Sequence, residues 1–187
     1  MKKLLKQNKG FSLVELLVAI LIMAVIAGTA IMLFGGVISS SKERADQETA
    51  ENIKRAILTY MNLTNDTDLS CLDESDSKEL IKKLSCVIKI DADTGVSFNV
   101  PDNAIFSEGP ESVDKDKIDG TDMKGEYGPF LDASKDMSPQ APGKVGWKIK
   151  IDEATQVIKV ESQKDEEDCT VDISSSTDED DGEGEGG

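Results

Sequence analysis

The residues with the clearest chemical meaning lie at the start of the chain, where a possible cleavage junction precedes a single carboxylate. Lys9, Gly10 and Phe11 join a lysine-rich leader to an apolar run that extends to Ile38, and Glu15 is the only ionisable side chain in that run. A carboxylate costs on the order of 2.5–3.5 kcal/mol at a bilayer centre, so Glu15 needs either interfacial water or a counter-charge. Cleavage after Gly10 would create such a charge, because the new α-ammonium of Phe11 would lie one helical turn away, on the same chain or a neighbouring one.

The apolar run is long enough to cross a membrane. A helix of its roughly 28 residues would span about 40 Å, against a hydrocarbon core of about 30 Å. A secretory signal has an apolar region of only about 7–15 residues with a small-residue cleavage site behind it, and no such site follows this run. The leader contains four lysines and no acidic residue, as a cytoplasmic flank would. Cleavage at the glycine would therefore leave the membrane helix on the mature protein.

The stretch that begins at Gly10, Gly-Phe-Ser-Leu-Val-Glu-Leu-Leu-Val, resembles the class III signal of type IV prepilins and pseudopilins. In that family a membrane prepilin peptidase cuts after the glycine and N-methylates the new phenylalanine, and the glutamate near the mature terminus helps to register an incoming subunit. The resemblance implies that Gly10 is the cleavage residue, Phe11 the methylated terminus and Glu15 the filament-registry carboxylate. It does not extend residue by residue into the rest of the chain.

Composition limits the function of the remaining sequence. The chain has 21 basic and 37 acidic residues, and loss of the four leader lysines would leave 17 basic ones. This acidity argues against nucleic acids and anionic lipid surfaces as partners. The chain has no histidine, which removes the commonest general base and the commonest zinc ligand. We find no nucleophile–base pair, metal spacing or phosphate loop, so we expect no enzymatic activity.

A second helical pattern continues the membrane segment. From Lys42 to Met61, apolar residues recur three or four positions apart among charged ones, which indicates a helix with one buried face. A Gly-Gly pair at Gly35 separates the two patterns. We predict either one helix from about Phe11 to Met61 or two segments hinged at Gly35.

Beyond this helix the pattern changes to that of a short helix and two hairpins. The short helix has Ser75 or Ser77 as its candidate cap and Leu80, Ile81 and Leu84 as its apolar side. The hairpins are expected at 87–100 and 147–160, with turns at 91–95 and 152–155, and an edge strand is expected at 170–173.

The second hairpin places Trp147, Ile149 and Ile151 on one face and lysines on the other. This alternation is expected when an antiparallel sheet covers a helix on one side only. Between the hairpins, the interval from Pro101 to Lys144 has no sustained period. It predicts a long irregular connection of the kind that often carries surface function.

These patterns predict an α+β pilin fold, in which a long N-terminal helix packs its distal half against an antiparallel sheet of about four strands. The last segment has no apolar residue after Ile173 and no basic residue after Lys164, so we expect disorder and a solubilising role there, with an ion-sensitive contact as the alternative. We divide the chain into a cleaved basic leader at 1–10, a transmembrane and filament-core helix at 11–38, the amphipathic half of the helix at 39–62, a globular αβ-loop and sheet domain at 63–173, and an acidic disordered tail at 174–187.

Two acidic stretches suggest a metal-site interpretation. The segment from Asp114 to Asp122 loosely resembles a calcium loop, but Ile118 occupies a ligand position and no glutamate closes the loop. The segment from Asp91 to Gly95 is explained by a β-turn. Some pseudopilins bind calcium near the C-terminus, so the resemblance keeps calcium as a candidate ligand; otherwise we expect no cofactor.

The three cysteines, Cys71, Cys86 and Cys169, cannot all pair with one another. The chain beyond the membrane would be extracytoplasmic, where disulfides persist. A Cys71–Cys86 bridge would close the loop that contains the short helix. A Cys86–Cys169 bridge would tie the first strand to the last and resemble the C-terminal clasp of many pilins. Three reduced thiols are the third alternative, and all three stay open at this stage.

The resemblance implies a pilin: a structural subunit that polymerises through its apolar helix into an extracellular type IV pilus used in adhesion, motility or biofilm. It implies a single-pass cytoplasmic-membrane precursor, with prepilin peptidase, copies of itself, other pilins and the membrane assembly machinery as partners. The first alternative is a pseudopilin or minor pilin of a type II secretion or DNA-uptake system. A membrane-anchored binding protein is the alternative from another class.

Overall fold

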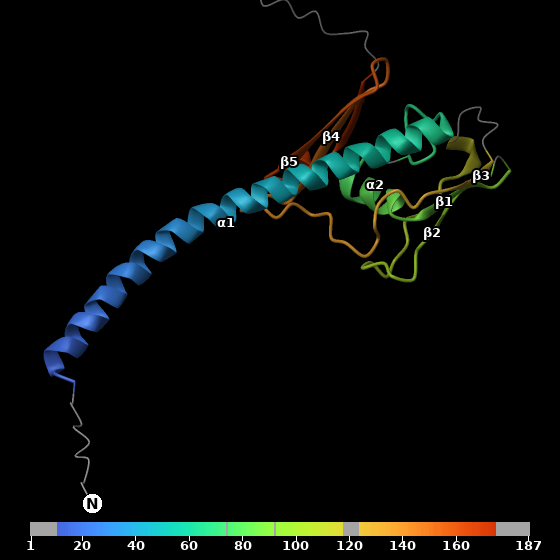
Figure 1. Ribbon diagram of the computed structural model, residues 1–187. Coiled ribbons are helices and arrows are strands. Elements are labelled where there is room, and N and C mark those ends of the chain that lie inside the picture. Colours follow the sequence, from blue (N-terminus) through green and yellow to red (C-terminus); the bar gives the residue numbers. More distant parts are fainter. Residues whose placement is uncertain (1–10, 74, 92, 118–123, 175–187) are drawn as a thin grey trace, which may run out of the picture. The chain divides into compact units, whose positions relative to one another are not determined.

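The computed structural model describes residues 11–73, 75–91, 93–117 and 124–174 (Figure 1). The chain divides into two units, Met1–Lys42 and Glu43–Gly187. One continuous helix, α1 (Leu13–Thr64), contains the described helical residues of the first unit and continues into the start of the second unit. The predicted long helix is therefore confirmed, and it has no break at Gly35.

In the second unit, α1 has one buried face. Ile53, Ile57 and Tyr60 are fully buried, and Met61 is nearly so. These residues lie three or four positions apart, so they fall on one side of a helix with 3.6 residues per turn. The amphipathic pattern in the sequence thus predicted correctly which side of α1 packs into the core.

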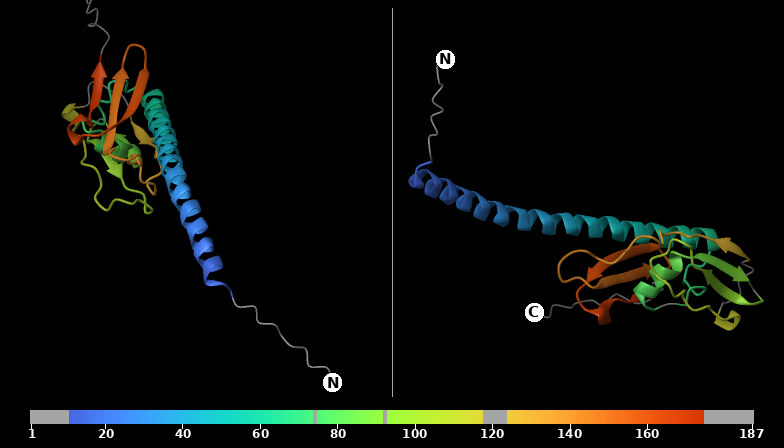
Figure 2. Two further views of the ribbon diagram at one scale, coloured as in Figure 1. Left: turned by 90° about the vertical axis from the view of Figure 1, so that its left-hand side faces the viewer. Right: turned by 90° about the horizontal axis from the view of Figure 1, so that it is seen from below.

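Two three-stranded sheets complete the second unit (Figures 1 and 2). The α+β class with a long N-terminal helix is confirmed, whereas the sheet of about four strands is replaced by six described strands in two sheets. The first sheet has the order β2-β1-β3 and consists of β1 (Val87–Asp91), β2 (Gly95–Asn99) and β3 (Gly125–Tyr127). The second has the order β5-β4-β6 and consists of β4 (Gly146–Asp152), β5 (Val157–Gln163) and β6 (Val171–Ser174).

Both predicted hairpins are present as antiparallel pairs, β1 with β2 and β4 with β5. Trp147, Ile149 and Ile151 are buried as the alternation predicted. Two features differ from the prediction. Strand β3, whose three residues lie in the expected irregular connection, pairs with β1. The edge strand β6 follows a short 3-10 helix, η2 (Glu166–Asp168), and runs parallel to β4.

The short helix α2 (Ser77–Leu84) buries Leu80, Ile81 and Leu84, as expected. Its cap is different from the one we predicted. Asp76, rather than Ser75 or Ser77, occupies the N-cap position, and its carboxylate accepts a hydrogen bond from Lys78 N at 2.7 Å. The Ser77 hydroxyl instead donates to the Cys169 carbonyl at 3.1 Å, which links α2 to the residues that precede β6.

The described part of the 101–144 connection contains the 3-10 helix η1 (Lys115–Lys117) and is fixed to both helices. The Phe130 and Leu131 amides donate to the Leu84 carbonyl at 2.9 and 3.2 Å. The buried carboxylate of Asp46 accepts hydrogen bonds from Gln140 N at 2.6 Å and Ala141 N at 3.0 Å. Since a buried carboxylate needs donors, these two amides explain why an acidic residue occupies the inner face of α1.

A second buried carboxylate fixes the chain where α1 ends. Asp66 is 3% exposed and accepts hydrogen bonds from the Tyr60 hydroxyl, from Ser70 N at 2.9 Å and from Cys71 N at 3.1 Å. Burial raises the pKa of Asp66 above its usual range; the hydrogen bond from Tyr60 lowers the pKa, and the nearby Asp68 raises it further. The network ties the last turns of α1 to the loop that leads to α2.

We predict that Asp66→Asn lowers the free energy of unfolding by about 1–3 kcal/mol. The NH₂ group of asparagine would face hydrogen-bond donors, and one of these buried donors would be left without an acceptor. The effect should depend on pH. The folded-state pKa of Asp66 is raised, so protonated Asp66 contributes its full stability below the unfolded-state pKa of about 3.9. This contribution is lost as the pH rises through the folded-state pKa. Asparagine does not titrate. The difference in stability between wild type and variant, measured by chemical denaturation, should therefore shrink above about pH 4. A difference that grows over this range would contradict the assignment.

Candidate processing and assembly segment

The described part of the processing segment begins at Phe11, which is 90% exposed. Ser12 precedes the first helical residue, Leu13, and so occupies the N-cap position of α1. The Ser12 amide donates a hydrogen bond to Glu15 Oε2 at 3.0 Å. The cleavage residue Gly10 lies outside the described residues.

This contact is one half of a capping box, in which a Ser-x-x-Glu sequence lets the glutamate accept from the amide of the N-cap residue. Glu15 also lies in the first turn of α1, where the positive end of the helix dipole favours an anion by about 0.3–1 kcal/mol. Its carboxylate therefore has a partner within its own chain before any neighbour is present. The cap is a third partner besides the water and the ammonium expected from the sequence, and the spacing of Ser12 and Glu15 is the sequence signal for it.

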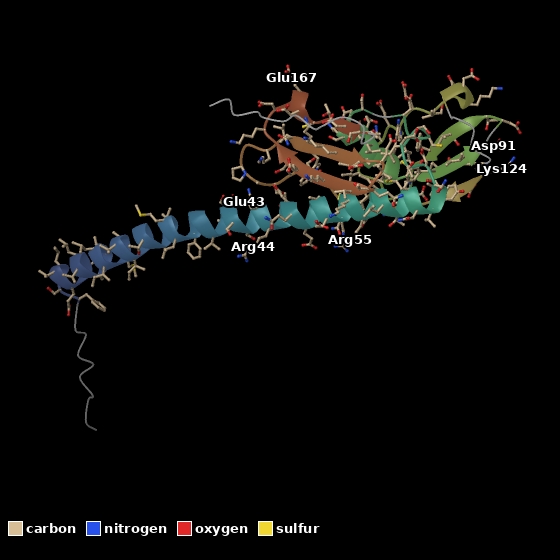
Figure 3. The ribbon with its side chains drawn as sticks, turned by 90° about the horizontal axis from the view of Figure 1, so that it is seen from above. Glu43, Arg44, Arg55, Asp91, Lys124 and Glu167 are labelled. Carbon is tan, nitrogen blue, oxygen red and sulfur yellow. The ribbon has the colours of Figure 1, made fainter. Side chains whose placement is uncertain are left out.

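Apolar side chains surround the helix behind this cap. The large apolar residues from Leu13 to Ile38 are between 47% and 84% exposed. They include consecutive positions, so no side of this stretch is polar, which is the pattern of a membrane span. By length and composition α1 can cross a membrane. Further along α1, the exposed charged residues Glu43 and Arg44 follow the apolar stretch (Figure 3).

A comparison with known protein families agrees with this geometry. The family model of the prokaryotic N-terminal methylation motif matches residues 5–31. The chain carries the class III signal of a type IV prepilin. The motif supports a pilin-like protein and, together with the apolar helix behind it, fits a membrane-anchored precursor; the match does not extend beyond residue 31. No curated protein and no solved structure matches the chain.

The structure contains Cys71, Cys86 and Cys169 as free thiols, so neither disulfide considered from the sequence is formed in it. Cys71 and Cys86 are fully buried, and Cys169 is partly exposed. Burial raises the pKa of Cys71 to about 12 and that of Cys86 to about 11. Thiols with such pKa values stay protonated at neutral pH and are poor nucleophiles. The two buried cysteines therefore act as packing residues.

The structure describes each of the two candidate calcium segments only in part. Residues 118–122 of the Asp114–Asp122 segment lie outside the described residues. In the β1–β2 turn, Asp91 accepts from Asp93 N at 3.0 Å and lies 3.2 Å from Lys124 Nζ (Figure 3). These contacts lower the pKa of Asp91, chiefly through the Asp93 amide. Across the described part of the chain, no three metal-ligating side chains gather at one point.

We predict that a maleimide at neutral pH modifies the native full chain at Cys169 alone, because Cys71 and Cys86 are inaccessible. Partial burial and then the neighbouring carboxylates raise the pKa of Cys169, so its reaction should be slower than that of a free peptide thiol. Peptide mass spectrometry would locate the label. In denaturant without reductant, all three thiols should react. Modification of a single cysteine there would reveal a disulfide and contradict the free-thiol state.

Proposed function

We propose that this protein is a structural subunit of a type IV pilus that polymerises through the apolar part of α1 into an extracellular filament for adhesion, motility or biofilm formation. The observation that carries the proposal is the apolar stretch from Leu13 to Ile38, which is exposed on all sides and follows a prepilin signal. A cut after Gly10 removes the leader lysines and keeps this stretch. The mature subunit can then be extracted from the membrane.

Assembly exchanges one apolar environment for another. In the bilayer, lipid tails cover the apolar side chains; in the filament, the corresponding helices of neighbouring subunits do so. Because lipid is as apolar as leucine, packing and polar contacts, rather than the hydrophobic effect, decide this exchange. The acidic globular parts would lie outside the helix bundle in contact with water.

Glu15 has a specific role in this proposal. Its Oε2 accepts from Ser12 N, so Oε1 can accept from the Phe11 ammonium of a neighbouring subunit. The cap fixes the carboxylate at the first turn of α1, and the ammonium supplies the opposite charge. An ion pair in a water-poor helix bundle would distinguish the correct axial position of a subunit from a shifted one, in which both charges lack a partner.

The proposed partners follow from this sequence of events. A prepilin peptidase would cut after Gly10 and methylate the nitrogen of Phe11. The membrane-embedded assembly machinery would then transfer the subunit to a filament that contains copies of itself and other pilins. The alternative within the same class is a pseudopilin or minor pilin of a type II secretion or DNA-uptake system.

Two measurements on the native protein test the proposal. Mass spectrometry of the mature N-terminus should find N-methylated Phe11, and an uncut Met1 or a cut behind the apolar stretch would exclude a pilin. Immunogold labelling should decorate surface fibres along their whole length. Labelling confined to fibre tips would indicate a minor pilin, and correctly processed protein without surface fibres would indicate a pseudopilin.

We predict that Glu15→Ala gives membrane-inserted, processed subunit without fibres. The substitution makes the segment more apolar and leaves the Lys9–Gly10–Phe11 junction intact, but it removes the partner of a buried ammonium, at a typical cost of about 3–5 kcal/mol. Membrane-fraction abundance, N-terminal processing and surface fibres are scored together.

Glu15→Gln is the matched control, because its amide oxygen can still accept from Ser12 N while the charge is lost. Fibres should be missing here as well. Normal fibres from Glu15→Gln, with none from Glu15→Ala, would show that the helix cap suffices and that no charge pair registers the subunit. Normal fibres from both variants would leave Glu15 without a role in assembly.

A further inference from the structure

The side of α1 that faces away from the sheets contains two positive and two negative side chains. Arg44 and Glu51 lie seven residues apart, which is about two helical turns, and so do Glu48 and Arg55. All four side chains are exposed. Ile53 is buried on the opposite side of the helix, and Figure 3 shows Arg44 and Arg55 pointing away from the sheets. We call these four residues the charge stripe.

The charge stripe is largely unpaired within its own chain. Arg44 precedes Glu48 by four residues, a spacing at which helical side chains can pair, and Glu51 precedes Arg55 by the same spacing. Among the described residues, however, the single ion pair that includes a member of the stripe joins Glu51 to Lys54 at 3.8 Å, and its side chains are 59% and 37% exposed. Such a pair contributes little, so the stripe is open to a partner from outside the chain.

The groove beside the stripe does not supply that partner. It lies between α1 and the 129–140 connection, and its charged lining residues from that connection are Asp132, Lys135 and Asp136. Lys135 Nζ lies 3.7 Å from Asp132 Oδ2, and Asp136 accepts a hydrogen bond from Ser138 N at 2.9 Å. No ion pair joins these residues to the stripe in the part of the chain that the structure describes.

The proposed contact between subunits defines an axial offset. In that contact, the Phe11 ammonium of a neighbouring subunit lies beside Glu15, which is four residues further along the sequence. Four residues of helix rise about 6 Å. Because both subunits contain the same helix, each residue of the neighbour's α1 then lies level with the residue four positions later, wherever the two helices run side by side.

This offset brings opposite charges of the stripe together. Arg44 of the neighbour lies level with Glu48, and Glu51 of the neighbour lies level with Arg55. The neighbour's other charged residues in this part of α1 meet no like charge. Lys42, Glu43, Asp46, Glu48, Lys54 and Arg55 of the neighbour lie level with Asp46, Gln47, Ala50, Asn52, Leu58 and Thr59.

Other offsets are less favourable. An offset of three residues places Glu48 of the neighbour level with Glu51, and an offset of five places the neighbour's Glu43 level with Glu48. Like charges that meet at an interface disfavour it. Offsets of six and seven residues also oppose unlike charges, but they place the neighbour's Phe11 beyond Glu15. The four-residue offset satisfies both the carboxylate at the start of α1 and the charge stripe.

We propose that the outer side of α1 between Arg44 and Arg55 binds a second copy of this chain, and that the charge stripe selects the four-residue offset. The inference rests on the proposed function and extends its interface beyond the apolar stretch. Apolar packing alone selects an offset poorly, because large apolar side chains occupy consecutive positions between Leu13 and Ile38. The charge stripe adds this selection, since a shifted subunit meets like charges. The contact weakens as ionic strength rises, because the stripe is exposed.

The test expresses two variants of the full chain, Arg44→Glu and Glu48→Arg, in the native host, each alone and both together, and measures surface fibres by electron microscopy. Alone, Arg44→Glu brings two carboxylates level at each contact, and Glu48→Arg brings two cations level, so we expect fibres to be lost. Together, the two variants can alternate, and every contact then joins opposite charges. We expect the mixture to form fibres that contain both variants.

The mixture separates this contact from effects within one subunit, because each variant keeps its own altered helix whether or not the other is present. Membrane abundance and N-terminal processing show that each variant is made. Glu43→Arg is the matched control, since this position lies level with neutral residues at the four-residue offset, and its fibres should be normal. Normal fibres from either single variant, or none from the mixture, would overturn the inference and leave the proposed function intact. Processed wild-type protein without fibres would overturn both.

Discussion

A polypeptide in a bilayer must satisfy its backbone hydrogen bonds internally, and this constraint decides the form of the first part of the chain. A break at Gly35 would expose unpaired amides and carbonyls to hydrocarbon, each at a cost of several kcal/mol. The structure keeps α1 continuous from Leu13 to Thr64, although nothing lies within 4 Å of where a Cβ would be at Gly28, Gly35 or Gly36. These glycines are therefore not required by packing within the subunit. They leave space on the helix surface at which another helix can approach closely.

The side-chain pattern of α1 changes along its length, from one suited to an apolar environment to one suited to a protein core with water on the other side. Up to Ile38 it is apolar on every side, whereas from Lys42 it buries one face against the sheets and exposes charged residues on the other. Asp46 lies near this change. By accepting the Gln140 and Ala141 amides, it holds a loop that is distant in sequence against the helix. The first buried residue of α1 is thus a carboxylate that receives hydrogen bonds, and the fully buried apolar side chains begin with Ile53.

Local periodicity was sufficient to predict α1, α2 and both hairpins, because each depends on residues close together in the sequence. Features that depend on distant partners were missed. Strand β3 has only three residues and is defined by its pairing with β1, and the parallel direction of β6 depends on how η2 turns the chain. Asp66 was missed for another reason: its donors Tyr60, Ser70 and Cys71 lie only four to six positions away, but the loop conformation that points them at its carboxylate has no periodic pattern. At the processing segment, the motif indicated Gly10, Phe11 and Glu15 as candidates, and the family comparison confirmed the motif itself.

Glu15 shows why the residue type alone did not define the chemistry of this segment. The cost of a carboxylate in lipid suggests that it must either remain hydrated or find a cation, and both alternatives treat it as an isolated charge. The structure adds a third contribution. The Ser12 amide is one of four that the start of any helix leaves without an intrahelical partner, and Glu15 accepts from it at 3.0 Å. An unpaired donor and an unpaired acceptor, each costly in lipid, thus satisfy one another. Glu15 therefore has one hydrogen-bond donor within its own chain, and the ion pair proposed above with the Phe11 ammonium of a neighbouring subunit would use its other carboxylate oxygen.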